Sequence, residues 1–453
     1  MTSGNEADRF VAVVGAGPAG IYASKQLADA GVRVVLLNRD IKPGGLAEYG
    51  IYHDKHKMKE GLRKQFRQIL ASPDIHYFGN VTVGENGIFT LEDLRDLGCQ
   101  AVLVTVGAQG TKWLGLPGED LQGVYHAKDI VYHYNQLPPF SQQQFHIGRR
   151  AALIGVGNVM VDVAHWLVRD LEIDEVVAVA RRGPAEVKFT KKEMESVVAN
   201  LDVAALDAEI VRVTPLMLDV GQSPEQARDF ILSAQARGEP ATSDTVMRFE
   251  FLSSPAAIID DGHGRVGGLE VEDTKLVPRN GDTSARSLGT RRVLDVDTVV
   301  FCIGDRVDEE FGLPVEWNEF IKNPDPRFST DGVSYEAFDP ATGAPIEGVF
   351  MAGWARKASD GLVGVARKDG TMGADAVLRY LETQPRLEPS QIRRREEQLM
   401  GRLAQSAVPV VRKADWKRLE EAEDAEAARR GVDTFKYGSN EEMLAAMGMA
   451  QLA

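Results

Sequence analysis

A glycine-rich turn between a buried strand and a helix restricts the fold of this chain more than any other feature. Residues 10–14 are apolar and mostly β-branched, residues 18–30 have a helical pattern, and residues 32–37 form another apolar strand. Strand, turn, helix and strand make a βαβ unit. In such a turn the first glycine permits the bend, the second lets backbone approach a pyrophosphate, and the third lets helix and strand pack closely. The helix N-terminus adds free N–H groups and a partial positive charge. The sequence therefore predicts a dinucleotide cradle in the turn, which reads Gly15, Ala16, Gly17, Pro18, Ala19, Gly20.

The same order of elements returns in the middle of the chain. A strand at 151–154 leads into Gly155, Val156, Gly157, Asn158, Val159 and Met160, then a helix to about residue 170 and a strand at 175–180. Met160 replaces the third glycine, so helix and strand should lie slightly further apart. Further buried strands are expected at 101–106, 298–303 and 348–352, and an exposed helix at 416–430. The pattern predicts an α/β fold with two Rossmann-like dinucleotide-binding domains.

The residues that close the second strand of each unit indicate which nucleotide binds there. In the first unit this residue is Asn38, where an acidic side chain usually accepts hydrogen bonds from ribose hydroxyls. The Asn38 amide oxygen can accept one such bond without the charge. In the second unit Arg181 and Arg182 follow the strand, and their charge and forked donors suit a 2′-phosphate. The second site is therefore predicted to take NADPH rather than NADH, although a solvated basic turn is the alternative. The positive patch continues at Lys188, Lys191 and Lys192.

Composition excludes several classes of protein. A formal net charge of −15 over 453 residues is unfavourable for a nucleic-acid partner. The two cysteines, Cys99 and Cys302, provide no disulfide framework, no redox dithiol and no cluster for an iron–sulfur centre or other metal. The N-terminus lacks the apolar core of a signal peptide, and no run approaches the length needed to cross a membrane. We therefore expect a soluble, cytoplasmic protein without a metal, a membrane or a nucleic-acid partner.

Two dinucleotide sites in one chain imply two different ligands. A nicotinamide dinucleotide delivers hydride, whereas a flavin accepts two electrons and can release them singly. This pairing is consistent with the lack of an obvious acid–base triad. We therefore expect FAD at the first site and NADP(H) at the second.

A set of longer motifs carries a resemblance to a known family. These motifs are GAGPAG at Gly15, PGGLAEYGI at Pro43, GNVTVG at Gly79, VGAQGTKWLGLPGED at Val106, GVGNVMVDVA at Gly155, ARRGPAEVKFT at Ala180, FLSSP at Phe251 and AGWARKASDGLVG at Ala352. Together they resemble the adrenodoxin-reductase-like, FAD-dependent ferredoxin–NADP(+) reductases, which include bacterial members. The resemblance covers nearly the whole chain.

This resemblance implies a domain organisation and an activity. An FAD domain would be built from both chain ends, residues 1–106 and 335–453, with an NADP domain inserted at 107–334. Hydride would pass from NADPH to FAD, and single electrons would then pass to a ferredoxin-type iron–sulfur protein.

The resemblance also implies roles for individual residues. Leu46 should contact the flavin, and Val81 the adenine side of FAD. Glu193 should face the nicotinamide. Trp354 should lie along the isoalloxazine with Gly361, Leu362 and Val363, where backbone N–H groups near Gly361 would stabilise charge on the reduced flavin. Cofactor contacts are further expected at Arg39, Gly45, Lys112 and Gly353.

The chain departs from the family pattern at several positions besides Asn38. The family often has arginine where this chain has Glu48, and histidine where it has Lys55. His53 and His56 are neighbours of that position, and a histidine near the flavin could transfer protons. The family also docks an acidic ferredoxin on a basic face. The candidates for it, which could equally form a solvated helix side, are Lys55, Lys57, Lys59, Arg63, Lys64 and Arg67.

Three other functions remain open at this point. The chain could be an electron-input subunit like the small subunit of glutamate synthase, although that subunit normally carries a cysteine-rich N-terminal extension and this sequence has none. It could be an NADPH oxidase or a quinone reductase. It could also be a redox sensor that binds dinucleotides without turnover.

Overall fold

The chain divides into two units, each with its own sheet, which is parallel in the second unit and parallel except for its two edge strands in the first. The computed structural model describes residues 7–279, 281–358 and 363–449. The first unit comprises Met1–Gly110, Tyr132–Gln142 and Asp305–Ala453, and the second comprises Thr111–Val131 and Gln143–Gly304.

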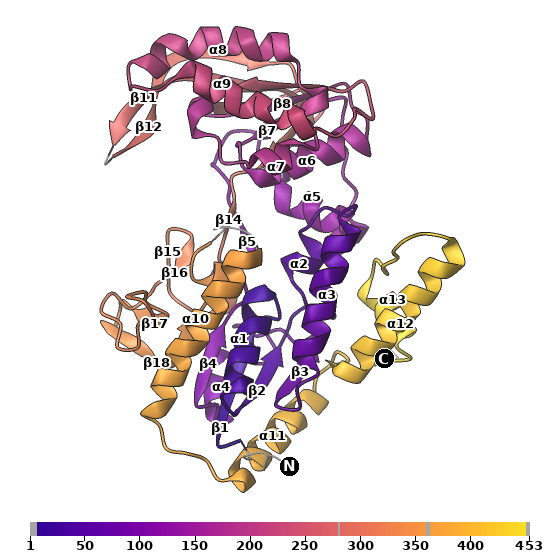
Figure 1. Cartoon of the computed structure of the whole chain (residues 1–453), viewed down its shortest axis with the longest axis vertical. Coiled ribbons are helices and arrows are strands. Elements are labelled where there is room, and N and C mark those ends of the chain that lie inside the picture. Colours follow the sequence, from indigo (N-terminus) through magenta and orange to yellow (C-terminus); the bar gives the residue numbers. More distant parts are fainter. Residues whose placement is uncertain (1–6, 280, 359–362, 450–453) are drawn as a thin grey trace. The chain divides into compact units, whose positions relative to one another are not determined.

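The first unit is built on a seven-stranded sheet of order β17-β18-β4-β1-β2-β3-β19 (Figure 1). The strands from β18 to β3 are parallel, and the two edge strands are antiparallel to their neighbours. The bounds are β1 (Arg9–Val14), β2 (Val32–Leu37), β3 (Ile75–Gly79), β4 (Ala101–Val104), β17 (Glu336–Asp339), β18 (Ala344–Met351) and β19 (Val411–Arg412).

Apolar layers cover both faces of this sheet. One face, with Val11 and Val13 of β1, packs against α1, α3, α10, α12 and α13. The other, with Phe10 and Ala12, packs against α4, α11 and the segment 307–320. A sheet covered on both faces has nearly continuous apolar strands, as β1 and β2 do. The helices are α1 (Pro18–Asp29), α2 (Leu46–Tyr49), α3 (His56–Leu70), α4 (Leu91–Asp96), α10 (Val363–Glu382), α11 (Pro389–Ala404), α12 (Lys413–Arg430) and α13 (Asn440–Ala446).

The second unit has a five-stranded parallel sheet of order β6-β13-β7-β8-β9 and a separate antiparallel sheet of order β10-β11-β12. The parallel strands are β6 (Val124–His126), β7 (Arg150–Ile154), β8 (Glu175–Val179), β9 (Val246–Glu250) and β13 (Thr298–Phe301). The antiparallel strands are β10 (Ser253–Asp260), β11 (Val266–Arg279) and β12 (Asp282–Leu294). The helices are α5 (Ala127–Tyr134), α6 (Asn158–Arg169), α7 (Lys191–Met194), α8 (Val203–Leu218) and α9 (Pro224–Leu232).

Short elements complete the fold. Two small ladders pair β5 (Gly110–Thr111) with β14 (Asp305–Arg306), and β15 (Val315–Glu316) with β16 (Glu319–Phe320). The 3₁₀ turns are η1 (Phe140–Gln142), η2 (Pro184–Glu186), η3 (Val198–Asn200), η4 (Ser233–Arg237), η5 (Glu309–Phe311) and η6 (Gly353–Ala355). None of the described helices combines the length and apolarity needed to span a bilayer.

The predicted α/β class and both βαβ units are confirmed. The helix expected at 416–430 is part of α12, but it is not exposed on all sides, because Trp416 and Leu419 are buried in the core of the first unit. The compact units differ in extent from the domains expected at 1–106 with 335–453 and at 107–334. Residues 132–142 and 305–334 cluster with the first unit. Residues 305–334 belong to the first unit because of hydrophobic packing: Phe311 and Phe320 are buried in the same apolar cluster as Phe10 of β1.

Candidate functional site

The first glycine turn has the geometry of a pyrophosphate cradle. Gly15 has φ +103°, and a Cβ there would lie 2.6 Å from the carbonyl oxygen of Thr105. A Cβ on Gly20 would lie 1.9 Å from the carbonyl oxygen of Gly15. Gly17, the N-cap of α1, instead faces open space, and a Cβ added to it would meet no atom within 4 Å. Two glycines are therefore required by the protein itself, whereas Gly17 leaves room for a ligand at a helix N-terminus.

The segment after β2 lies over this turn. The Gly44 N–H donates to the carbonyl oxygen of Ala16 at 2.7 Å. Gly45 has φ +49°, and a Cβ on it would lie 2.9 Å from Gly17 Cα. Leu46, half-buried, begins α2 directly after this close approach. The expected contact residues Gly45 and Leu46 are thus brought to the first glycine turn.

The side chain of Asn38, the first residue after β2, forms hydrogen bonds with the protein's own backbone. Its Oδ1 accepts a hydrogen bond from the Ala16 N–H at 2.9 Å. Its Nδ2 donates to the carbonyl oxygens of Asp40 and Lys42 at 2.8 and 3.1 Å. Its side chain is buried, and the Val81 N–H donates to its carbonyl oxygen at 2.9 Å. Asn38 therefore braces the glycine turn and the following loop, which a carboxylate could not do because it has no N–H to donate.

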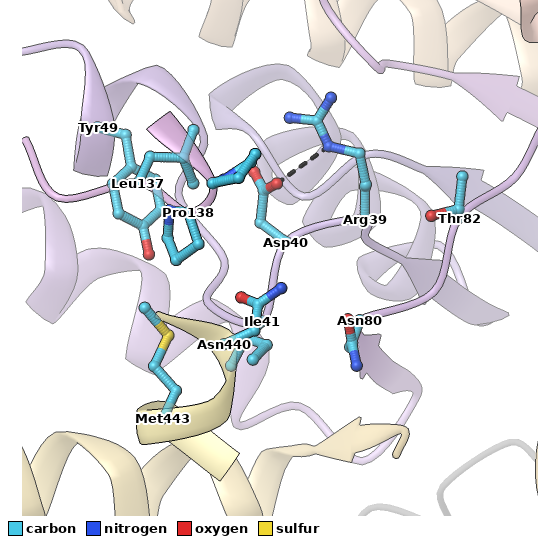
Figure 2. A pocket seen from close by; sticks show the side chains of 11 residues that line it. Arg39, Asp40, Ile41, Tyr49, Asn80, Thr82, Leu137, Pro138, Asn440 and Met443 are labelled. Carbon is cyan, nitrogen blue, oxygen red and sulfur yellow. Dashed lines mark hydrogen bonds and ion pairs between the residues drawn. The ribbon is translucent and has the colours of Figure 1, made fainter. Parts of the chain in front are cut away.

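A cavity of about 190 Å³ opens beside Asn38. Figure 2 shows Arg39 and Asp40 on its wall, joined by a hydrogen bond from Arg39 Nε to Asp40 Oδ1 at 3.1 Å. Asn80 and Thr82, the two neighbours of Val81, line the same cavity. Val81 itself is buried. The expected residue Arg39 is therefore at the carboxyl end of β2, where ligands of open α/β sheets bind.

The second glycine turn repeats the geometry of the first. Gly155 has φ +116°, and a Cβ there would lie 2.5 Å from the carbonyl oxygen of Cys302. Gly157, the N-cap of α6, faces open space. Asn158 Oδ1 accepts from the Thr190 N–H at 2.8 Å, and Val159 is exposed. This turn therefore has the same free helix N-terminus.

Cations gather near the second turn. The Lys188 N–H donates to the carbonyl oxygen of Val156 at 2.8 Å, so the segment that follows Arg181 and Arg182 runs beside the turn. Arg182 donates to the carbonyl oxygen of Thr283 at 3.3 Å and to Asp282 Oδ2 at 3.5 Å. The exposed cations of this patch are Arg181, Lys188, Lys191 and Lys192. Their charge fits an additional phosphate beside the pyrophosphate site.

The structure places the other predicted residues of the second unit near these elements. Glu193 is half-buried on α7, in the first turn after Thr190, the N-cap residue that bonds to the second glycine turn. Lys112 is half-buried. Burial lowers the pKa of His126 to about 4, and the charges of Lys128 and, to a smaller extent, Lys112 act in the same direction.

The predicted residues of the C-terminal half meet α1. A Cβ on Gly353 would lie 2.7 Å from Ala19 Cβ, which places η6, and with it Trp354, beside the start of α1. The Gly353 N–H donates to Asp369 Oδ2 at 2.6 Å. Val363 is half-buried at the start of α10. Gly361 and Leu362 lie outside the described residues.

Comparison with known proteins finds relatives over nearly the whole chain. The model of the pyridine nucleotide-disulphide oxidoreductase family matches residues 9–205. NADPH-ferredoxin reductase FprA of Mycobacterium tuberculosis is 29% identical, over 96% of this chain and 98% of that protein. Its structure in complex with NADPH has a TM-score of 0.79 at 27% identity, and the match covers 97% of this chain and 99% of that one. The mitochondrial NADPH:adrenodoxin oxidoreductase of Arabidopsis thaliana is 26% identical over 80% of each chain.

The chain is a homologue of the adrenodoxin-reductase-like ferredoxin–NADP(+) reductases. The family resemblance predicted from the motifs is thereby confirmed.

Glu48, one of the departures from the family pattern, is the centre of a buried ionic cluster. Its carboxylate, 3% exposed, accepts two bonds from Arg63 at 2.7 and 2.6 Å. Lys436 Nζ lies 2.8 Å from Glu48 Oε1, and Lys42 Nζ lies 3.8 Å from it. Lys42 also pairs with Glu423 of α12. This cluster, Lys42, Glu48, Arg63, Glu423 and Lys436, ties the C-terminal segment to the loop that covers the first glycine turn.

Three cations of the α3 face that was expected to dock a partner are already bound to other residues of the first unit. Arg63 is bound to Glu48, and Arg67 donates to Glu420 of α12 at 3.0 Å. Lys59 is buried and donates to Asn135 Oδ1 at 2.5 Å. For these three residues the prediction of a free basic face on α3 is wrong, because Glu48 of α2, Glu420 of α12 and Asn135 bind them. The exposed cations of α3 are Lys57 and Lys64, and Lys55 is half-buried.

The two candidate histidines have different surroundings. The His53 ring is 4.5 Å from the Tyr52 ring and 6.0 Å from the Tyr134 ring, so it belongs to an aromatic group. His56 begins α3, and its Nδ1 is 3.5 Å from Thr434 Oγ1. A proton-transfer role for either residue remains a prediction. The Glu48 cluster was not predicted from the sequence. The signal that could have indicated it was the acid at position 48, where the family often has arginine.

Proposed function

We propose that this chain is an NADPH-dependent ferredoxin reductase that uses FAD to pass electrons from NADPH to an iron–sulfur protein. One observation carries the proposal: two glycine turns each leave a helix N-terminus open at the second glycine, and an arginine pair follows the strand of only one of them. The homology to proteins named NADPH-ferredoxin reductase and NADPH:adrenodoxin oxidoreductase supports the same activity.

The residues of the first unit fit an FAD pyrophosphate. The open face at Gly17 and the N-terminus of α1 would hold the anion, with the segment from Gly45 packed over the turn. A bound flavin supplies acceptance of a hydride and release of single electrons. Trp354, Val363 and Leu46 are the described residues that we assign to the isoalloxazine end, and Arg39 and Val81 to the adenosine end.

The second unit would bind and orient NADPH. Gly157 and the N-terminus of α6 would hold its pyrophosphate, and Arg181 and Arg182 its 2′-phosphate. We assign Glu193 and Lys112 to the nicotinamide side of this unit. Orientation is the main contribution of the protein, because hydride transfer requires a fixed approach of donor and acceptor.

The electron acceptor that we propose is a ferredoxin-type protein in the cytoplasm. Cys99 and Cys302 are both buried, free thiols, which supports a reducing compartment. Burial also raises the pKa of the Cys99 thiol to about 12, so this thiol is not a nucleophile at neutral pH.

The test is anaerobic reduction of the purified, flavin-loaded protein. NADPH is expected to bleach the flavin absorbance much faster than NADH does. Replacing Arg181 and Arg182 with alanine should remove this preference, whereas Arg286→Ala, an exposed arginine of the same unit, should leave it unchanged. A colourless protein that does not take up FAD would overturn the proposal, and so would equal rates with both nucleotides in the unaltered chain.

The acceptor is tested with the NADPH-reduced protein. Ferredoxin should be reduced at a higher kcat/KM than quinone or oxygen. A preference for quinone or oxygen would favour an oxidase or a quinone reductase, and no turnover with any acceptor would favour a redox sensor.

A further inference from the structure

At the position that usually binds the adenosine ribose, this chain has a side chain that is already bonded to its own backbone. In dinucleotide folds an acid at the end of the second strand accepts hydrogen bonds from the ribose hydroxyls. Asn38 stands at that position, but its Oδ1 already accepts from the Ala16 N–H, and its Nδ2 donates to two carbonyl oxygens. At 7% exposure, its side chain has little surface left for a ligand.

A carboxylate is present two residues further along. The Asp40 side chain is 18% exposed and lines the cavity at the carboxyl end of β2. In Figure 2 its carboxylate lies beside the Arg39 guanidinium, on the same cavity wall. Arg39 Nε donates to Asp40 Oδ1 at 3.1 Å, and among the described residues no hydrogen bond to Oδ2 is found. Arg39 thus orients the carboxylate and leaves one oxygen available.

The backbone holds Asp40 in this position. Its carbonyl oxygen accepts from Asn38 Nδ2 at 2.8 Å and from the Asn80 N–H at 3.2 Å. Asn80 has φ +61° and lines the cavity next to Thr82. The carboxylate is therefore presented by a loop that Asn38 itself braces.

We infer that Asp40, rather than Asn38, accepts the hydrogen bonds of the adenosine ribose hydroxyls of FAD. This inference rests on the proposed function, since it requires FAD in the first unit. A carboxylate can accept from both hydroxyls of a vicinal diol, and such charge-assisted hydrogen bonds are stronger than those of a neutral amide. Asn38 is then a positioning residue, which holds both the glycine turn and the Asp40 loop.

The experiment compares two flavins on the apoprotein of the full chain. One is FAD and the other is an FAD analogue whose adenosine lacks the 2′- and 3′-hydroxyls, with Kd measured by calorimetry. Asp40→Asn should weaken FAD binding roughly tenfold or more but leave the binding of the analogue unchanged. Asn38→Ala should weaken both flavins, because it loosens the glycine turn that both of them use, whereas Asp40→Asn should weaken FAD alone. The matched control is Asp29→Asn, an exposed acid of the same unit paired with Lys25, which should change neither Kd.

Each outcome separates this inference from the proposed function. Equal loss of both flavins in Asp40→Asn, or no loss of FAD binding, would overturn the inference while the protein still binds FAD. If Asp40→Asn does not fold, the unaltered chain decides: equal Kd values for FAD and the analogue would show that no residue holds the ribose hydroxyls. A chain that binds neither flavin would instead refute the proposed function.

Discussion

Neutralising Glu48 is expected to destabilise the first unit strongly. Burial alone would raise the pKa of the Glu48 carboxyl, yet the charges of Lys436, Lys42 and Arg63 hold this pKa well below its ordinary value. The carboxylate is thus ionised at neutral pH, and its single negative charge is shared by three cations, Lys436, Lys42 and Arg63. Glu48→Gln keeps the size of the side chain and removes only the charge.

The magnitude follows from what the substitution leaves behind. Removing one partner of a buried ion pair costs about 3–5 kcal/mol, because the other charge remains buried. Burial already lowers the pKa of the Lys436 ammonium to about 8, so Lys436 can release its proton once Glu48 is neutral. This release limits the loss to the lower end of the range, about 3 kcal/mol. Such a loss corresponds to about 6–12 °C in Tm for a large domain.

The assay is thermal unfolding monitored by circular dichroism. Excess FAD is present, which keeps the site equally filled in every variant. A double-mutant cycle of Glu48→Gln and Lys436→Met should show that the double variant loses about 2 kcal/mol less than the sum of the single variants. The matched control is Glu60→Gln, whose ion pair with Arg67 is exposed and should be worth at most about 1 kcal/mol. A Glu48→Gln variant as stable as Glu60→Gln, or a coupling of zero, would refute the reasoning.

Three further predictions concern the glycine turn, a buried lysine and the second site. Gly17→Ala should leave Tm unchanged but abolish tight FAD binding, since Gly17 faces open space that the ligand would fill. Gly20→Ala should instead prevent folding, because its Cβ would lie 1.9 Å from a carbonyl oxygen. If Gly17→Ala binds FAD as tightly as the unaltered chain, Gly17 does not form a pyrophosphate cradle. Burial and the nearby positive charge of Lys436 lower the pKa of Lys59 to about 6, so from about pH 6 to 10 the unfolded chain holds one more proton than the folded chain. Lys59 should therefore make the free energy of unfolding rise with pH in that window by up to about 1.4 kcal/mol per unit. Urea unfolding of Lys59→Met should lose this slope between about pH 6 and 8 and keep the part that Lys436 contributes above pH 8. Asp282→Asn should lower the Kd for NADPH roughly two- to fivefold and leave the Kd for NADH unchanged, because this exposed acid competes with the 2′-phosphate for Arg182. Weaker NADPH binding by Asp282→Asn would contradict this competition.

The fold class could be predicted because its signals are local. The strands at 10–14 and 151–154 are apolar runs bounded by glycines, and each glycine turn is followed by a helical pattern. The steric need for Gly15 and Gly155 arises from a backbone carbonyl of a neighbouring strand, which the βαβ topology places there in every such unit. Pattern and turn chemistry therefore agree with the tertiary structure.

The Glu48 cluster could not be predicted in the same way. Glu48 and Lys436 are far apart in the chain, and no periodicity connects α2 with the segment after α12. The cations of α3 have the spacing of a solvated helix face, and only the tertiary structure shows that Arg63 pairs with Glu48 and Arg67 with Glu420 of α12. The extent of the first unit differs from the expected domain for a similar reason, since Phe311 is buried with Phe10 of β1, which precedes it by hundreds of residues.

The departures at Asn38 and Glu48 have one consequence in common. Asn38 binds the Ala16 N–H and the carbonyl oxygens at the start of the loop, while Glu48 anchors its end to Arg63 and Lys436. The loop that covers Gly17 is therefore held at both ends by the protein's own side chains. A loop organised in this way is preorganised, so FAD binding should not have to order it. Amide hydrogen exchange at Gly44, which donates to Ala16, should accordingly be as slow in the apoprotein as in the flavin-loaded protein, whereas faster exchange in the apoprotein would show that the ligand completes the loop.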